Sequence, residues 1–260
     1  MPLVSIVIPV YNQLALTLKC LLAISQTTDL ATTEILLVDD ASPEFNLTEL
    51  VGHPARVIRN PQNRGFAASC NIGAMHSNPQ SNYLCFLNSD TEPRAGWVEP
   101  LAAAFADDTI GLAGPKLLFP DGTIQSAGGL FDAGRGPYHR HLGYGGDYRA
   151  VNAPRTVSWI TGACHFMPRD LFMQLGGYDE GYVRGYFEDV DLCMRLKAVG
   201  KSIWYEPRSV MTHHAGASAG TKTAQEGKEA AARFRRNSLR FHARWDSVIV
   251  PDVKEIHVNY

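Results

Sequence analysis

Short runs of β-branched and apolar residues alternate with helical patterns over the first 93 residues, and this alternation restricts the possible fold more than any other feature. The runs are too short and too rich in Val and Ile for buried helices, so they indicate strands. The sequence predicts strands over residues 3–8, 34–38, 56–58 and 83–87, with helices near Leu14–Leu21 and Phe66–Met75. Repeated strand–helix units form a mostly parallel sheet with helices on both faces, the α/β class.

Polar residues follow these strands where each strand ends. Pro9 is expected to end the first strand, and Asp39-Asp40, Asn60–Gly65 and Asn88–Asp90 follow the next three. Sheets of this class bind ligands outside the carboxyl ends of their strands. The coincidence of the clusters therefore predicts a binding site at this edge.

The second part of the chain lacks the regular alternation of strands and helices. We expect strands, a long functional loop over 132–153, and a helix from Pro168. The predicted strands are 110–119, 123–131, 156–166 and 202–205. The two parts are expected to share one mixed sheet, in a single domain over 1–220 with halves 1–93 and 94–220. A basic helix and tail would follow over 221–260.

An acidic stretch at 185–196 combines a Gly/aromatic loop with helical spacing. Glu188 and Asp189 would lie at the first helical turn, where the helix dipole favours a carboxylate. They can act as a base for a hydroxyl group or simply cap the helix. The helix is predicted from an apolar stripe and an exposed ion pair: Leu192, Leu196 and Val199, and Asp191 with Arg195.

Four motifs each have a structural and a functional interpretation. Adjacent acids at a strand end point opposite ways, so Asp39-Asp40 suits one structural and one ligand role. Asn88-Ser89-Asp90 is a degenerate D-x-D motif, whose alternate residues could face a metal-bound diphosphate or close an Asx-turn. His213-His214 could cap a strand or complete a metal site. His139-Arg140-His141 could contact an acceptor or form a solvated loop tip.

Composition excludes several classes of protein. The formal net charge of −2 argues against nucleic-acid binding. Five cysteines without CxxC spacing suggest core residues, notably Cys20, Cys85 and Cys193, and a reducing, cytoplasmic location. The N-terminus has neither a signal-peptide pattern nor a membrane span. Dinucleotide-binding, P-loop and G-x-S-x-G motifs are missing from the sequence.

An ordered set of motifs resembles glycosyltransferase family 2, the inverting nucleotide-sugar transferases with a GT-A fold. The closest likeness is to bacterial enzymes that build surface polysaccharides, including rhamnosyltransferases. The motifs are VSIVIPVYNQ (4–13), ILLVDDAS (35–42), NRGFAASCN (63–71), FLNSD (86–90), TGACHFMPRDLFMQLGGYDE (161–180), YFEDVDLCMRL (186–196) and HHAGAS (213–218).

The resemblance implies roles for individual residues. Asp40 would hydrogen-bond a pyrimidine ring, and Asp189 would be the catalytic base, with Glu188 beside it in the acceptor site. The nucleotide-sugar set would be Pro9, Tyr11, Asn12, Asp39, Asp40, Asn63, Gly65, Asn88 and Ser89. The metal ligands would be Asp90 and His213, with His214 as a competitor, and the acceptor set Trp159 and Gly162. Asn88 replaces the usual first aspartate of the D-x-D motif.

The expected reaction is transfer of a sugar from a UDP- or dTDP-sugar, with rhamnose favoured by the resemblance, to a saccharide or lipid-linked saccharide. Mg²⁺ or Mn²⁺ would assist. A basic amphipathic segment at 222–245 would either contact an anionic inner membrane surface or pack on the sheet. A pyrophosphorylase would need a Gly-rich basic loop after the first strand, which Pro-Val-Tyr-Asn does not offer. A non-catalytic nucleotide-sugar-binding module remains the other alternative.

Overall fold

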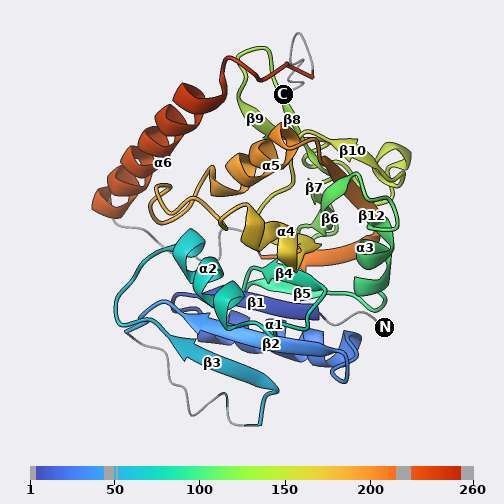
Figure 1. The fold of residues 1–260 in the computed structure, drawn as a ribbon, viewed down its shortest axis with the longest axis vertical. Helices are drawn as coiled ribbons and strands as arrows, with labels where there is room; N and C mark the ends of the chain where they lie inside the picture. The colour runs from blue at the N-terminus through green and yellow to red at the C-terminus, as the bar shows by residue number, and fades with distance from the viewer. Residues whose placement is uncertain (1–3, 44–49, 51, 215–223, 253–260) are drawn as a thin grey trace.

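A ten-stranded central sheet with helices on both faces forms the body of the protein (Figure 1). This computed structural model describes residues 4–43, 50, 52–214 and 224–252. The strand order is β10-β12-β6-β11-β4-β1-β2-β3. The predicted α/β class, and the expectation that both parts of the chain share one mixed sheet, are confirmed.

The first half forms the parallel side of the sheet. Its elements are β1 (Val4–Val10), α1 (Leu14–Thr27), β2 (Thr33–Asp39), β3 (Ala55–Arg59), α2 (Phe66–His76) and β4 (Tyr83–Leu87). β1 pairs in parallel with β2 and β4, and β2 pairs with β3. Pro9 does not end β1 as predicted but pairs with Val38. Its missing N–H is tolerated because the pairing of β1 with β4 stops at Val7.

The second half adds a mixed portion to the same sheet. Its elements are β5 (Thr91–Pro93), α3 (Val98–Ala104), β6 (Ile110–Leu118), β7 (Ile124–Ser126), β10 (Arg155–Val157), β11 (Cys164–Pro168), α4 (Arg169–Gln174), α5 (Glu188–Ala198) and β12 (Ser202–His213). β11 joins β4 to β6 through antiparallel pairs, and β12 runs parallel to β6. β12 is longer than the predicted strand, so it carries His213 to the same region as β5.

Two predicted strands are broken in the structure. The segment 123–131 forms β7 and then β8 (Gly129–Phe131), which pairs with β9 (Pro137–His139) in a separate sheet. The break falls at Gly128, whose φ of 83° is costly for other residues. The segment 156–166 is likewise divided between β10 and β11. The supposed loop 132–153 contains β9 and a 3₁₀ turn at Arg149–Val151.

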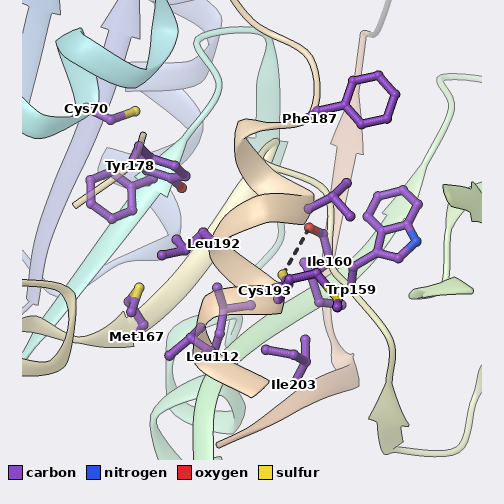
Figure 2. Packing of buried hydrophobic residues seen from close by; sticks show 14 of the residues in the cluster. Cys70, Leu112, Trp159, Ile160, Met167, Tyr178, Phe187, Leu192, Cys193 and Ile203 are labelled. Atoms are coloured by element: carbon purple, nitrogen blue, oxygen red, sulfur yellow. Dashed lines mark hydrogen bonds between the residues drawn. The ribbon is translucent and has the colours of Figure 1, made fainter. Parts of the chain in front are cut away.

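The two sheet faces carry different helices. Residues of α1 and α3 share one buried cluster with Ile6 and Ile8, whereas α2, α4 and α5 pack with Val7 on the other face. Figure 2 shows Leu192 and Cys193 of α5 beside the buried residues of the sheet. Alternate residues of each strand thus serve the two clusters, as the pleat requires.

The helix α5 differs from its prediction in two details. Leu192 and Leu196 are buried, but Val199 lies beyond the helix end and is 56% exposed. The predicted ion pair forms, with 2.8 Å between Arg195 Nε and Asp191 Oδ2, yet Asp191 is fully buried. This is because α6 covers the side of α5 that was expected to be exposed.

The last helix, α6 (Ala224–Trp245), packs against the face that carries α5. Phe241 and Trp245 are buried there, and Trp245 Nε1 donates to Asp191 Oδ1 at 2.8 Å. The remaining positions 221–223 and 253–260 of the predicted basic helix and tail, and 215–218 of the HHAGAS motif, lie outside the described residues. None of the helices described has the length and apolar character needed to cross a bilayer.

Candidate active site

A cleft of about 690 Å³ opens at the carboxyl ends of β1, β2 and β4. Every predicted nucleotide-sugar residue except Asp39 lines it, together with the predicted metal ligand Asp90. These residues are Pro9, Tyr11, Asn12, Asp40, Asn63, Gly65, Asn88, Ser89 and Asp90. The strand-end clusters therefore come together, because the carboxyl ends of parallel strands meet at one edge.

The two adjacent aspartates have different surroundings. Asp39 is fully buried and accepts hydrogen bonds from Ser42 N at 3.0 Å and Arg59 Nη1 at 2.7 Å. Its role is structural. Asp40 faces the cleft, where its carboxylate accepts from Arg64 N at 2.8 Å and Gly65 N at 2.7 Å. Asp40 thus holds the loop before α2 in place from within the cleft.

Two amide oxygens in the cleft have no hydrogen-bond partner among the residues that the structure describes. The Oδ1 atoms of Asn12 and Asn63 are buried without a hydrogen bond in the described part of the chain. Asn12 is fixed by a left-handed backbone (φ 59°) and by its N–H, which donates to Ser42 Oγ at 2.7 Å. Buried acceptors without partners are costly, so both atoms mark places where a ligand can donate hydrogen bonds.

The proposed metal ligands meet where β12 pairs with β5. Asp90 Oδ1 lies 3.0 Å from His213 Nε2, and His213 Nδ1 lies 2.5 Å from Gln125 Oε1. Since Gln125 Oε1 can only accept, Nδ1 carries the proton and Nε2 presents its lone pair toward Asp90. A carboxylate oxygen and an imidazole lone pair at this distance need a cation or a proton between them. This donor pair fits a divalent cation.

The neighbouring histidine points elsewhere. His214 Nε2 lies 2.6 Å from Glu92 Oε1. The other residue of the degenerate D-x-D motif, Asn88, is near His213 instead, with 3.3 Å between Asn88 Nδ2 and His213 Nε2. Adjacent side chains of an extended strand alternate between faces, which separates the two histidines. Among the described residues, no group of three or more His, Cys, Asp or Glu side chains could hold a metal ion. Gln125 was missed by the sequence analysis because only β7 pairing brings it to His213.

Asp189 lies at the first turn of α5, beside the cleft wall. Its Oδ2 accepts from Gly162 N at 2.9 Å, and its Oδ1 accepts from Val190 N at 2.8 Å. A Cβ atom on Gly162 would lie 3.2 Å from the Asp189 Cβ and 3.5 Å from the ring of Phe66, which lines the cleft. The lack of a side chain at Gly162 therefore permits the close approach of Asp189.

Glu188, which was predicted beside Asp189 in the acceptor site, is a buried side chain. It is 6% exposed, and its Oε2 has no hydrogen-bond partner among the described residues. Burial, and secondarily the charge of Asp189, raise the pKa of Glu188 well above its ordinary value. Consecutive helical side chains point about 100° apart, so only one of the two acids can face the cleft wall.

The predicted acceptor residue Trp159 is a core side chain. It is 4% exposed, and its Nε1 donates to Leu130 O at 3.1 Å. The ring of His139 packs against it with centroids 4.9 Å apart, and burial lowers the pKa of His139. His139 therefore belongs to β9 rather than to a solvated tip. His141 instead contacts the exposed ring of Tyr144.

The family model described as Glycosyl transferase family 2 matches residues 5–176, which hold most of this cleft. The chain belongs to this family. Several relatives have similar sequences. This chain is 30% identical over 94% of its length to Uncharacterized protein y4gI of Sinorhizobium fredii, and the match covers 28% of that protein. It is 32% identical over 81% of its length to the pre-mycofactocin glycosyltransferase of Mycobacterium tuberculosis, covering 42%.

A third relative from M. tuberculosis is the N-acetylglucosaminyl-diphospho-decaprenol L-rhamnosyltransferase, 32% identical over 55% of this chain and 50% of that protein. The chain thus spans half or less of the length of these relatives. The resemblance to the family that the sequence motifs indicated is confirmed.

Solved structures share the fold. GalNAc-T7 with UDP, GalNAc and Mn²⁺ superposes with a TM-score of 0.69 at 20% identity, covering 82% of this chain and 44% of that one. The mannosyltransferase PcManGT from Pyrobaculum calidifontis with GDP-Man and Mn²⁺ gives 0.67 at 15% identity, covering 96% and 66%. The predicted GT-A fold is confirmed.

Proposed function

We propose that this chain is a metal-dependent inverting glycosyltransferase that moves a sugar from a UDP- or dTDP-sugar to a hydroxyl of a saccharide or lipid-linked saccharide. The reaction would serve the synthesis of bacterial cell-surface polysaccharide, with rhamnose as the favoured sugar. The observation that carries the proposal is the cleft at the sheet edge, which has the Asp90–His213 pair at one side and Asp189 beside its wall. The name of the rhamnosyltransferase relative supports the choice of sugar.

Asp90 and His213 would hold the divalent cation, as Mn²⁺ in GalNAc-T7 and PcManGT also suggests. When bound, such a cation offsets the negative charge of a departing diphosphate. The ring of His213 is held in the required tautomer by Gln125, an arrangement that keeps Nε2 available as a ligand. Asn12 and Asn63 would accept hydrogen bonds from the nucleoside through their Oδ1 atoms, which have no partner in the described part of the chain.

Asp189 would be the general base. In a single displacement, the acceptor oxygen forms a bond to the anomeric carbon while the bond from that carbon to the diphosphate breaks. The hydroxyl proton passes to the Asp189 carboxylate, which two backbone N–H groups hold in a fixed orientation. Burial raises the pKa of Glu188 well above its ordinary value, which disfavours its charged form. A second negative charge beside the proposed base is therefore disfavoured.

The proposal is tested by measuring nucleoside diphosphate release from UDP- and dTDP-sugars in Mn²⁺, with and without a saccharide or lipid-linked acceptor. Acceptor-dependent release that EDTA abolishes is the expected result. A non-catalytic binding module would bind the donor without acceptor-dependent release. A pyrophosphorylase would instead form pyrophosphate from a nucleoside triphosphate and a sugar 1-phosphate. Either outcome would overturn the proposed function.

A further inference from the structure

We propose that α6 completes the donor site: Arg233 of α6 and Arg184 of the loop before α5 bind the donor's diphosphate, and Asn237 of α6 positions that loop. The inference rests on the proposed function, because it names groups that recognise the donor. The family match ends at residue 176, so all three residues lie outside the matched segment. They come from a part of the chain that the sequence analysis considered only as a membrane or packing helix.

Arg233 reaches the cleft from the middle of α6. It lines the cleft together with Ala230, one helical turn earlier. The Nε atom of Arg233 is buried and has no hydrogen-bond partner in the described structure. A guanidinium group offers five N–H donors in a planar fork that matches phosphate oxygens. A buried donor that faces a cleft without a partner therefore indicates an anionic ligand.

Arg184 lines the same cleft beside the loop that Asp40 organises. A Cβ atom on Gly65 would lie 2.8 Å from the Arg184 Cα, so the two backbones are in direct contact. Gly65 has a φ of 86° and lacks a side chain at the one place where Arg184 needs the space. The contact places a second cation at the cleft wall, next to residues proposed to bind the nucleotide.

Asn237 holds the backbone that carries Arg184. Its side chain is buried, and its Nδ2 donates to Gly185 O at 2.8 Å and Tyr186 O at 3.2 Å. Residues 184–187 form a continuous left-handed run, with φ of 59° at Arg184 and 74° at Phe187. Such a run persists only where surrounding contacts fix it. Because Asp189 follows immediately, Asn237 positions both Arg184 and the start of α5.

The other charged groups of the cleft do not bind a diphosphate in place of the two arginines, Arg184 and Arg233. Asp40 is occupied by backbone N–H groups, and Asp90 faces His213. Glu226 and Glu229 also line the cleft, but from the exposed first turns of α6. A diphosphate carries several negative charges, more than one divalent cation neutralises. Arginine pairs with phosphate through charge-assisted bonds that are stronger than neutral ones.

The test compares UDP, dTDP and uridine binding to the full chain by isothermal titration calorimetry, in Mn²⁺ and in EDTA. R233M should weaken binding of whichever nucleoside diphosphate, UDP or dTDP, the wild type binds more tightly. The loss should be about 10-fold or more both in Mn²⁺ and in EDTA, since charge-assisted hydrogen bonds are lost. Uridine binding should not change. Arg235 is exposed on the same helix and does not line the cleft, so R235M is the matched control and should bind as wild type. Thermal melts verify that each variant is folded.

The positioning role of Asn237 is tested by a double-mutant cycle. N237A should weaken binding of the same diphosphate in the wild-type background but add little to R184M, because it acts through Arg184. An equal further loss in the R184M background would overturn that role. Wild-type binding by R233M would overturn the inference for Arg233 while leaving the proposed function intact. A wild-type chain that binds no nucleoside diphosphate would overturn the proposed function itself.

Discussion

The two neighbouring acids at the start of α5 differ in burial, and this difference assigns their roles. Asp189 lies beside the cleft wall, where Gly162 N–H donates to it. Asp189→Asn keeps the shape of the side chain but removes the proposed base. We expect turnover to fall about 10²–10⁴-fold, the usual contribution of general base catalysis. Donor affinity should be unchanged, as measured by nucleoside diphosphate release and calorimetry.

The matched control is Asp170→Asn, because Asp170 also occupies the first turn of a helix, α4, but is exposed. This variant should have wild-type turnover. If Asp189→Asn also turned over at the wild-type rate, another residue would have to accept the proton.

Glu188 should make folding stability depend on pH. The pKa of Glu188 in the folded chain is raised above 4.5, its ordinary value, by burial and by Asp189. The folded state therefore binds this proton more tightly than the unfolded state. The stability that this tighter proton binding contributes is complete below about pH 4.5. It is lost as pH rises toward the folded pKa of Glu188, at up to about 1.4 kcal/mol per pH unit.

Urea denaturation between pH 5 and pH 7 would measure this effect. Glu188→Gln is neutral at every pH, so its free energy of unfolding should decline less with pH than that of the wild type. Glu99→Gln, on the exposed first turn of α3, should follow the wild-type profile. Parallel profiles for Glu188→Gln and wild type would mean that folding does not raise the pKa of Glu188.

The adjacent histidines provide a matched pair for the metal site. His213 faces Asp90 and is oriented by Gln125, whereas His214 pairs with Glu92. His213→Ala should raise the Mn²⁺ concentration needed for half-maximal activity at least 10-fold, since a ligand is lost. His214→Ala should leave it unchanged. The reverse result would move the metal ligand to His214.

At the scale of residues, sequence motifs predicted most of the polar cleft-lining residues of the first half, such as Asp40, Asn63 and Asn88, because these residues follow predicted strands. Gln125 and Arg233 had no such signal. They reach the site through pairing and packing with segments distant in sequence: β7 on β6, and α6 beside the α5 loop. The burial of Trp159 and Glu188 depends likewise on contacts that a local pattern does not contain.

At the scale of elements, α6 has two distinct faces. The inner face carries Phe241 and Trp245, and Arg244 Nη1 and Trp245 Nε1 both bond Asp191 Oδ1, at 3.1 and 2.8 Å. A buried carboxylate is tolerated only when it is paired and hydrogen-bonded. The inner face therefore fixes α6 on α5. This contact supports the expectation that the segment 222–245 packs on the body of the protein. It says nothing about the outer face of α6.

The outer face of α6 combines Arg235 and Arg236 with the exposed apolar side chain of Leu239. Basic residues near an anionic membrane contribute about 1 kcal/mol each, so we expect the chain to bind anionic vesicles weakly at low salt. Flotation with vesicles of anionic or neutral lipid measures this. The charge-reversed variant R235E/R236E should not float. Equal flotation of both chains would exclude a contact through this face.

The strands of the first half were predictable because strong apolar runs end at clear turn signals. The breaks of the second half were not. Gly128 folds β7 away from β8 because its backbone lies against Val157, where a Cβ atom would be 2.5 Å from the Val157 Cγ1. This contact joins segments 29 positions apart, and nothing in the local pattern of 123–131 marks it.

At the scale of the whole molecule, the end of the described chain ties α6 to the second half. Asp252 accepts from Phe131 N at 2.7 Å, and Ser158 Oγ donates to Asp252 Oδ2 at 2.7 Å. The chain thus crosses from the cleft, along α6, to β8. The predicted boundary after residue 220 separates segments that line one cleft. We therefore regard α6 as part of the proposed catalytic unit.

Because the cleft is lined by loops of the first half, by Arg184 and by α6, a bound donor should stabilise the whole fold. Ligand at 100 times its dissociation constant adds about 2.7 kcal/mol. For a chain of this size the melting temperature should rise by about 5–10 °C. We expect this shift for UDP or dTDP with Mg²⁺ or Mn²⁺.

We expect Asp40 to select the nucleobase of the donor. Its carboxylate can accept the ring N–H of uracil or thymine, while still holding the backbone N–H of Gly65. Adenine offers no ring N–H on its pairing edge, and guanine is larger, so ADP and GDP should shift the melt little. PcManGT was solved with GDP-Man on the same fold, which makes GDP the informative competitor. A larger shift with GDP than with UDP and dTDP would mean that Asp40 serves only to hold the loop before α2.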